Sequence, residues 1–396
     1  MATASRLMAR LDRNGRRALY DDVLLCEYGE LGAIELEPDP STAGYYMPHH
    51  AVFKAESTTT KTRVVFNASA SQAGCESLNA LLDPGPSLLP SLAGLLIPFR
   101  EQPVAVQTNI RKAFVMIGMK EADRRYLRFL WSDASDKMQV WRLARVPFGV
   151  NCSPFLLTAV LRTHLESSLE HATPTEADVF GRLRDSLYVD DCIASVQTND
   201  AARQFKKIGT ACLETAGMDL RKWKCNVSLG DDEVQSSGKV LGLCWNGEED
   251  SLRIPVPPDC DDPTTKRQLL HCVASLYDPL GFASPYVLQG KLFLKELWQE
   301  AVAWDDQAAA SMQVLIRRWW RERTALQHQP LPRYLSCSAE AVIHLFVDAS
   351  ESGFSCCIYA TWPRVSELIF SKAKVAPMKQ QTLALMELQA AFVGSR

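Results

Sequence analysis

Two adjacent aspartates, Asp190 and Asp191, are the residues of this sequence with the clearest chemical potential. Short apolar runs flank them at 186–189 and 192–196, which predicts a strand, a two-residue turn and a second strand, with both acids at a hairpin tip. Neighbouring carboxylates repel each other, so their joint exposure indicates a cation between them. Carboxylates that hold two divalent ions support nucleotidyl transfer. The alternative is an ordinary solvated acidic turn, which the pair alone does not exclude.

The composition is that of a globular protein with a substantial core. The 396 residues allow two or three domains, with 47% hydrophobic and 22% charged residues. A net charge of −3 excludes a basic nucleic-acid coat, although a catalytic cleft needs only a local basic lining. No apolar run is long enough to cross a bilayer, and the first residues contain no secretion signal. We therefore expect an intracellular protein with no membrane partner, whose twelve cysteines are reduced and mostly buried.

Hydrophobic patterning predicts an α+β protein. The strands that it predicts lie at 61–66, 104–108, 138–143, 240–245, 342–347 and 354–360. The helices that it predicts lie at 153–169, 201–216, 265–276, 287–304 and 380–393. An apolar stripe at helical spacing covers 312–326, and a proline-rich run at 255–258 indicates a boundary. The acidic pair would then lie in the first, mixed part of the chain.

Five motifs, in this order and spacing, resemble those of BEL/Pao-type retrotransposon reverse transcriptases. They lie at 58–70, 109–114, 146–150, 188–191 and 220–223. Further segments resemble the region named Pao retrotransposon peptidase, at 274–281 and 295–298, and the start of a ribonuclease H, at 346–350 and 386–388. The chain shows no protease motif. The resemblance covers nearly the whole sequence.

The resemblance implies a right-hand polymerase of fingers, palm and thumb, followed by a helical connection and a truncated α/β ribonuclease H-like unit. The implied bounds are 1–100 for the fingers and palm entry, 101–230 for the palm, 231–335 for the thumb and connection, and 338–396 for the partial ribonuclease H-like domain. It implies Mg²⁺ or Mn²⁺ as cofactor. The implied partners are an RNA or DNA template with primer, deoxynucleoside triphosphates and the rest of the element polyprotein.

In that family Asp190 and Asp191 would bind the metal ions. A third position departs from the family, because Asn109 stands where an aspartate is usual. An amide brings no charge, and no acid lies within three residues of it. Losing one anionic ligand costs several kcal/mol, and about 3 kcal/mol is already a hundredfold in rate. Asn67 also replaces a usual aspartate, so we expect a weakly active or inactive copy.

The resemblance gives five residues roles around the nucleotide and the primer. Phe114 would lie under the incoming sugar, although core packing explains it too. Gly149 would let the backbone approach template and nucleotide closely. Leu241 and Gly242 resemble the primer grip. Tyr188 would pack near the primer end, and a half-buried strand aromatic is the alternative.

Several basic residues have both a functional and a plain interpretation. Arg63 and Lys61 would hold triphosphate oxygens, or are surface cations. Lys222 would be a phosphate partner or late proton donor, or a solvated cation. A basic helix would lie along a nucleic-acid backbone; it contains Arg317, Arg318, Arg321 and Arg323, with Trp319 and Trp320. In the alternative interpretation, the tryptophans belong to the core and the arginines form a solvated face. The adjacent His49 and His50 point opposite ways in a strand, which favours core or surface positions over a metal site.

In the ribonuclease H segment, Asp348 and Glu387 match two metal ligands of the family, and the remaining acids are expected beyond residue 396. This unit is therefore expected not to cleave RNA. Two functions remain open: a reverse transcriptase impaired by Asn109, or a decayed or domesticated scaffold that binds nucleic acid or protein without catalysis. The ordered motifs argue against an unrelated protein with an acidic turn.

Overall fold

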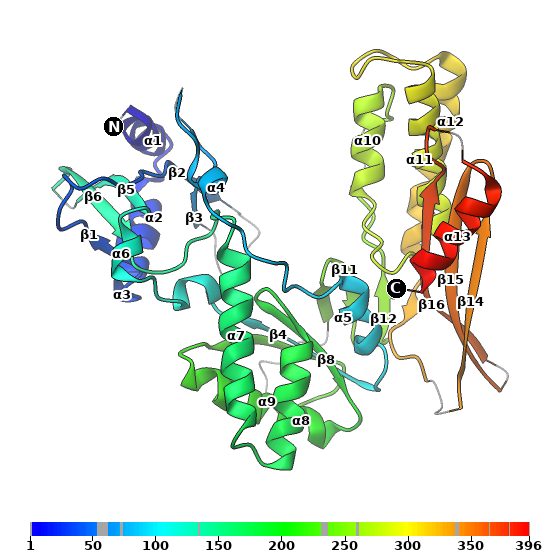
Figure 1. Cartoon of the computed structure of the whole chain (residues 1–396), viewed down its shortest axis with the longest axis horizontal. Helices are drawn as coiled ribbons and strands as arrows, with labels where there is room; N and C mark the ends of the chain where they lie inside the picture. Colours follow the sequence, from blue (N-terminus) through cyan, green and yellow to red (C-terminus); the bar gives the residue numbers. More distant parts are fainter. Residues whose placement is uncertain are drawn as a thin grey trace. The chain divides into compact units, whose positions relative to one another are not determined.

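The computed structural model describes residues 2–53, 62–71, 74–133, 135–230, 237–258, 261–336, 340–363, 365–379 and 381–395. The chain forms two compact units, each assembled from three stretches (Figure 1). The amino-terminal unit contains Met1–Leu89, Ile110–Asp190 and Ile208–Arg221. The carboxyl-terminal unit contains Pro90–Asn109, Asp191–Lys207 and Lys222–Arg396. Both combine helices with strands, so the predicted α+β class is confirmed.

The carboxyl-terminal unit contains two antiparallel sheets. The first has the order β10-β11-β12-β13, with bounds Ser237–Val240, Leu243–Asn246, Ser251–Arg253 and Leu331–Pro332. The second has the order β14-β15-β16, with bounds Val342–Ala349, Gly353–Trp362 and Val365–Val375. The single strand predicted at 240–245 is therefore wrong, because the chain reverses at Leu241 and Gly242, which both have positive φ. Strand β16 was not predicted.

Helices pack on one another and on the second sheet of this unit. Their bounds are α5 Leu92–Phe99, α10 Lys266–Ser275, α11 Ser284–Gln299, α12 Ala310–Glu322 and α13 Leu383–Gly394. A 3₁₀ segment, Arg323–His328, follows α12. Helix α11 packs against α10, α12 and strand β16, and α13 packs against β14 and β15.

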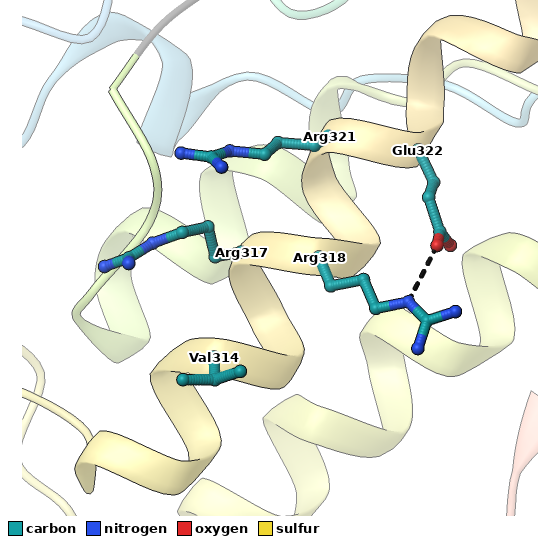
Figure 2. A pocket seen from close by; sticks show the side chains of 5 residues that line it. All are labelled: Val314, Arg317, Arg318, Arg321 and Glu322. Carbon is teal, nitrogen blue, oxygen red and sulfur yellow. Dashed lines mark hydrogen bonds and ion pairs between the residues drawn. The ribbon is translucent and has the colours of Figure 1, made fainter.

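Helix α12 separates its apolar and basic residues. Trp319 and Trp320 are buried in the cluster that α10, α11 and α12 share. Arg317, Arg318 and Arg321 point outward around a shallow depression (Figure 2). The prediction of core tryptophans and solvated arginines is thus confirmed for these residues. It is wrong for Arg323, which is buried and donates to the Trp320 carbonyl oxygen at 2.8 Å, because it begins the 3₁₀ segment.

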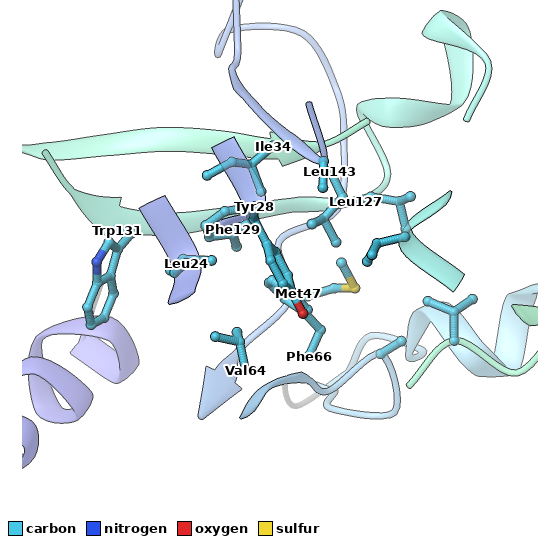
Figure 3. Close-up of a cluster of buried hydrophobic side chains, with 14 of the residues drawn as sticks. Leu24, Tyr28, Ile34, Met47, Val64, Phe66, Leu127, Phe129, Trp131 and Leu143 are labelled. Atoms are coloured by element: carbon cyan, nitrogen blue, oxygen red, sulfur yellow. The ribbon is translucent and has the colours of Figure 1, made fainter. Parts of the chain in front are cut away.

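The amino-terminal unit contains a large apolar cluster of buried residues (Figure 3). Its strands are β1 Ile34–Leu36, β2 His49–Phe53, β3 Thr62–Phe66, β5 Arg128–Ser132, β6 Met138–Leu143 and β7 Leu187–Tyr188. The first five of these strands form a three-stranded sheet, β1-β6-β5, and a separate antiparallel pair, β2-β3. Aromatic residues such as Phe66, Phe129 and Trp131 fill the cluster. His49 is buried against them and His50 is exposed, as the alternation along a strand predicts.

The helices of this unit are mostly short. Their bounds are α1 Ala2–Arg13, α2 Arg17–Asp21, α3 Tyr28–Glu30, α4 Leu78–Leu81, α6 Glu121–Arg124, α7 Ser153–Leu169 and α8 Pro174–Asp185. A π-helical segment, Asp22–Glu27, joins α2 to α3, and a 3₁₀ turn covers Ala113–Met116. The longest of these helices, α7, packs against α8.

The acidic pair belongs to a further sheet, of order β7-β8-β4-β9. Its other strands are β4 Val104–Ile110, β8 Asp191–Val196 and β9 Leu220–Cys225, with α9 covering Asn199–Thr215. Phe205 of α9 packs against Trp223 of β9, with ring centroids 6.4 Å apart. Gln107 of β4 donates to the Lys239 carbonyl oxygen of β10 at 2.9 Å. Asn109 lies two residues beyond Gln107 and therefore on the same face of β4.

Candidate active site

The predicted acidic hairpin is present. Tyr188 ends β7, Asp191 begins β8, and Val189 and Asp190 form the turn between them. Val189 adopts a left-handed φ of +56°, which a β-branched residue rarely accepts. The Asp190 carbonyl oxygen accepts a hydrogen bond from the Ile110 amide at 2.8 Å. This backbone hydrogen bond therefore fixes the position of the hairpin turn along the end of β4.

Asn109 meets the second acid directly. Strands β4 and β8 are antiparallel, and their register places Asn109 opposite Asp191. The Asn109 Nδ2 donates to Asp191 Oδ1 at 3.0 Å, and both side chains are half-buried. The structure thus brings together the side chains of Asn109 and Asp191, and Asp190 immediately precedes Asp191 in the hairpin turn.

These residues do not fit a site for two divalent ions. The donor set is two carboxylates and one neutral amide, and the amide directs its nitrogen, not its oxygen, at Asp191. Among the described residues, no three His, Cys, Asp or Glu side chains gather closely enough to hold an ion. Mg²⁺ prefers oxygen ligands with negative charge. At this position Asn109 therefore donates a hydrogen bond to the Asp191 carboxylate, whereas a third acid would bind cations.

Strand β9 supplies basic residues next to β4. Lys222 is exposed and has a left-handed φ of +56°, whereas Lys224 is half-buried. Burial lowers the pKa of Lys224, the charge of Lys222 lowers it further, and the charge of Asp191 opposes both. The role predicted for Lys222 remains a prediction, and Lys224 was not predicted at all.

Phe114 and Gly149 have clear packing functions. Phe114 is buried, and its ring contacts that of Phe148 at a centroid distance of 4.6 Å. Gly149 has a φ of +98°, and a Cβ there would overlap the Phe66 carbonyl oxygen. The close approach at Gly149 is therefore to the protein backbone. Contacts of either residue with a nucleotide or template remain predictions.

The predicted primer-grip residues form the turn of the β10–β11 hairpin. Leu241 has a φ of +42° and Gly242 a φ of +94°. Tyr277 packs on this turn, since its hydroxyl donates to the Leu241 carbonyl oxygen at 2.7 Å and a Cβ at Gly242 would overlap its ring. Asp278 accepts from the amides of Phe282 and Ala283, at 3.0 and 2.7 Å. Tyr277 thus holds this turn, and sequence reasoning missed it.

The remaining predicted residues are spread over other elements. Arg63 is exposed on β3, and Lys61 lies outside the described residues. Asn67 is exposed, and its Oδ1 accepts from the Ser69 amide at 3.1 Å, so it caps a local turn. The substrate roles of Arg63 and Lys61 remain predictions.

The two ribonuclease H positions are both exposed. Asp348 lies near the end of β14, opposite Ser355 of β15. Glu387 lies in α13, which packs on those two strands. Their role as metal ligands remains a prediction.

Family models match two parts of the chain. Residues 53–244 match the model described as reverse transcriptase (RNA-dependent DNA polymerase). Residues 265–396 match the model described as the Pao retrotransposon-like RNaseH-like domain. The chain combines a reverse transcriptase domain with a Pao-type ribonuclease H-like domain. The resemblance to BEL/Pao-type proteins is thereby confirmed, and the second description refers to ribonuclease H and not to a peptidase.

Solved structures of foamy viral protease–reverse transcriptase resemble the chain in fold. The structure in complex with RNA/DNA hybrid gives a TM-score of 0.60 at 14% identity, covering 93% of this chain and 44% of that one. A complex with double-stranded DNA gives 0.62 at 16% identity, covering 94% and 70%. A further double-stranded DNA complex, of the form named dRH, gives 0.62 at 16%, covering 93% and 58%. The chain thus spans 58% of the structure of the form named dRH, and the predicted reverse transcriptase fold is confirmed. No curated protein matches the chain.

Two expectations drawn from the composition concern membrane-spanning segments and cysteines. None of their helices combines the length and hydrophobicity required to cross a membrane. The ten cysteines described there are all free thiols. Five of these ten are buried, so half of the described cysteines, and not most of them, lie in the core.

Proposed function

We propose that this chain is a retroelement reverse transcriptase that binds primer–template and deoxynucleoside triphosphates but transfers nucleotides slowly. The family-model matches support the type of reaction. The similar structures are complexes with double-stranded DNA and with RNA/DNA hybrid, which supports the nucleic-acid partner. Mg²⁺ or Mn²⁺ is the cofactor that this chemistry uses, and Asp190 and Asp191 are the residues that would hold it.

The hydrogen bond from Asn109 to Asp191 carries the proposal of slow transfer. The charge that develops on the transferring phosphoryl group is stabilised chiefly by positioned ions and charges. Replacing one anionic ligand by an amide weakens that arrangement by several kcal/mol. A loss of about 3 kcal/mol lowers the rate about a hundredfold.

Primer extension on an RNA template tests this proposal. We compare the wild-type chain with Asn109→Asp, and use Asp190→Asn as the inactive control. We expect Asn109→Asp to extend primers about a hundredfold faster than wild type. All three chains should bind primer–template within about threefold of one another in a fluorescence anisotropy assay, because backbone contacts dominate such affinity.

Each outcome has a clear meaning. Equal rates for wild type and Asn109→Asp would refute the impairment by Asn109. Binding without extension by either chain would favour the second candidate, a non-catalytic nucleic-acid scaffold, which the internally satisfied Asn109–Asp191 pair also supports. Absence of primer–template binding would refute the reverse transcriptase proposal itself.

A further inference from the structure

Helix α1 concentrates positive charge in a chain that is acidic overall. Residues 2–17 contain five arginines and a single acid, which gives them a net charge of +4, whereas the whole chain carries −3. Three of these arginines, Arg6, Arg10 and Arg13, follow one another at spacings of four and three residues, so they lie on one face of the helix. We call these three residues the α1 basic face.

The charges of the α1 basic face are exposed and are not neutralised by acids of the protein. All three arginines are exposed, and among the described residues no carboxylate forms an ion pair with any of them. The nearest acid in sequence, Asp12, pairs instead with Arg17 at 3.6 Å. Arg6 donates from Nε to the Ala2 carbonyl oxygen at 3.2 Å, a bond within the helix that leaves its charge uncompensated.

Helix stability does not account for the α1 basic face. Cations at the carboxyl end of a helix interact favourably with its dipole, which explains Arg10 and Arg13 in the last turn. Arg6 lies in the amino-terminal half of α1, where the dipole gives no such gain. Like charges at these spacings also repel one another. The three arginines are therefore more favourable beside an anionic partner than in the free chain.

The opposite face of α1 decides between two kinds of anionic partner. An amphipathic basic helix binds an anionic membrane by inserting its apolar side into the bilayer interface. In α1 that side is occupied, because Leu7 and Leu11 are only 5% and 2% exposed and belong to the apolar cluster of the amino-terminal unit. A phosphodiester backbone needs only the exposed guanidinium groups, which bind phosphate oxygens through charge-assisted hydrogen bonds. The structure therefore favours nucleic acid over a membrane.

The spacing of the arginines also suits a polynucleotide. At a rise of about 1.5 Å per residue, Arg6 and Arg13 lie about 10 Å apart along the helix axis. One strand of a duplex presents about three phosphates over that length, since its charges follow one another every 3.4 Å or so. Three arginines along this length thus match three successive phosphates.

We propose that the α1 basic face binds the phosphodiester backbone of a nucleic-acid strand, through charge and without reading bases. This surface lies outside the five sequence motifs, which begin at residue 58, and no metal-binding residue takes part in it. The proposal rests on the proposed function only in taking nucleic acid as the partner. It adds a contact that would hold the template or the duplex in addition to the candidate active site.

The salt dependence of binding tests the proposal. Fluorescence anisotropy measures binding of the whole chain to a labelled blunt RNA/DNA duplex and to a labelled single-stranded RNA. The α1 variant combines Arg6→Gln, Arg10→Gln and Arg13→Gln, and glutamine keeps a high helix propensity. We expect it to bind at least one probe about tenfold more weakly than wild type at low salt. The slope of log K against log salt should fall by about 2–3, roughly one for each lost phosphate contact.

A charge-matched variant separates a local contact from the effect of overall charge. It combines Arg182→Gln, Arg203→Gln and Arg318→Gln, which remove exposed arginines that each pair with an acid of the same helix. Its net charge equals that of the α1 variant, and its affinity and salt slope should stay within about threefold and about 0.5 of wild type. Circular dichroism checks that the α1 variant is folded. If it is not, the three single variants replace it, each with an expected fall in slope of about one.

Two results would overturn the proposal. One is an equal salt slope for the α1 variant and wild type with both probes. The other is loss of binding to phosphatidylserine vesicles in the α1 variant while its nucleic-acid binding is unchanged, which would assign the α1 basic face to a membrane. Failure of the proposed function is distinguishable, because there wild type itself does not bind primer–template. Failure of this proposal alone leaves wild-type binding intact and equal in the α1 variant.

Discussion

At the scale of single residues, asparagine at position 109 removes a charged ligand for metal ions and supplies a hydrogen bond to Asp191. Without an ion, a carboxylate at this place would repel Asp191, whereas the Asn109 amide donates a hydrogen bond to it. The same residue type that weakens ion binding therefore satisfies the Asp191 carboxylate with a hydrogen bond. This explains how a polymerase-type hairpin keeps its geometry without a third acid.

A second residue, His49, makes the stability of the amino-terminal unit depend on pH. Its ring is buried beside Trp131, at a centroid distance of 5.2 Å, and it bonds to the Tyr20 hydroxyl and the Leu130 carbonyl oxygen. Burial lowers the pKa of His49 from 6.5 to about 4, the bond to Leu130 raises it, and the nearby His50 lowers it. As the pH falls from 6.5 towards 4, the unfolded chain therefore binds a proton that the folded chain does not.

We predict that this difference destabilises the folded chain by about 2 kcal/mol at pH 5 relative to pH 8. Urea unfolding followed by tryptophan fluorescence at several pH values measures it. In His49→Gln the loss of stability between pH 8 and pH 5 should be smaller by that amount. His50→Gln, at the exposed neighbour, should keep the wild-type slope. Parallel curves for His49→Gln and wild type would contradict the assignment.

At the scale of elements, persistent hydrophobic patterns predict the bounds of strands and helices correctly, whereas short apolar runs do not. The predicted bounds 138–143 and 153–169 coincide with β6 and α7, because alternation and helical periodicity persist over their whole length. The run at 240–245 is apolar throughout, so it hides the turn at Leu241 and Gly242. Because side chains alternate along a strand, the sequence also contains a signal for Lys224, which lies two residues beyond Lys222 in β9. The sequence-based prediction did not include it.

The β10–β11 hairpin depends on an element that lies later in the sequence. Tyr277 follows α10, and its hydroxyl bonds to the Leu241 carbonyl oxygen. We predict that Tyr277→Phe accelerates hydrogen exchange at residues 240–244 about fivefold to tenfold, since one such bond contributes about 1 kcal/mol. Primer–template affinity should fall by a similar factor if this turn positions the primer. Tyr359→Phe on β15 is the matched control, and unchanged exchange at 240–244 in Tyr277→Phe would refute the prediction.

At the scale of the whole molecule, buried arginines join segments that no local pattern connects. Arg333 is fully buried and binds both Asp250 oxygens, at 2.6 and 2.7 Å. It also donates to the carbonyl oxygens of Phe99, Gln102 and Pro103, which lead into β4. These partners lie 83 to 234 residues away in sequence. Periodicity predicts elements, but such pairings arise only when the chain has folded, so the sequence did not indicate Arg333.

Because β4 carries Asn109, loss of Arg333 should also affect the candidate site. Arg333→Met leaves the half-buried Asp250 and three carbonyl oxygens without their donor, which costs about 3–5 kcal/mol. We predict that exchange of the amides in 99–109 and 243–253 accelerates about a hundredfold or more, measured by mass spectrometry. Arg318→Met, which removes an exposed arginine that pairs with Glu322, should change protection by less than about threefold. Adding Asp250→Asn to Arg333→Met should recover part of the loss, because it removes the unpaired charge. If Arg333→Met and Arg318→Met exchange alike, the entry to β4 is held by packing, and the position of Asn109 does not depend on this arginine.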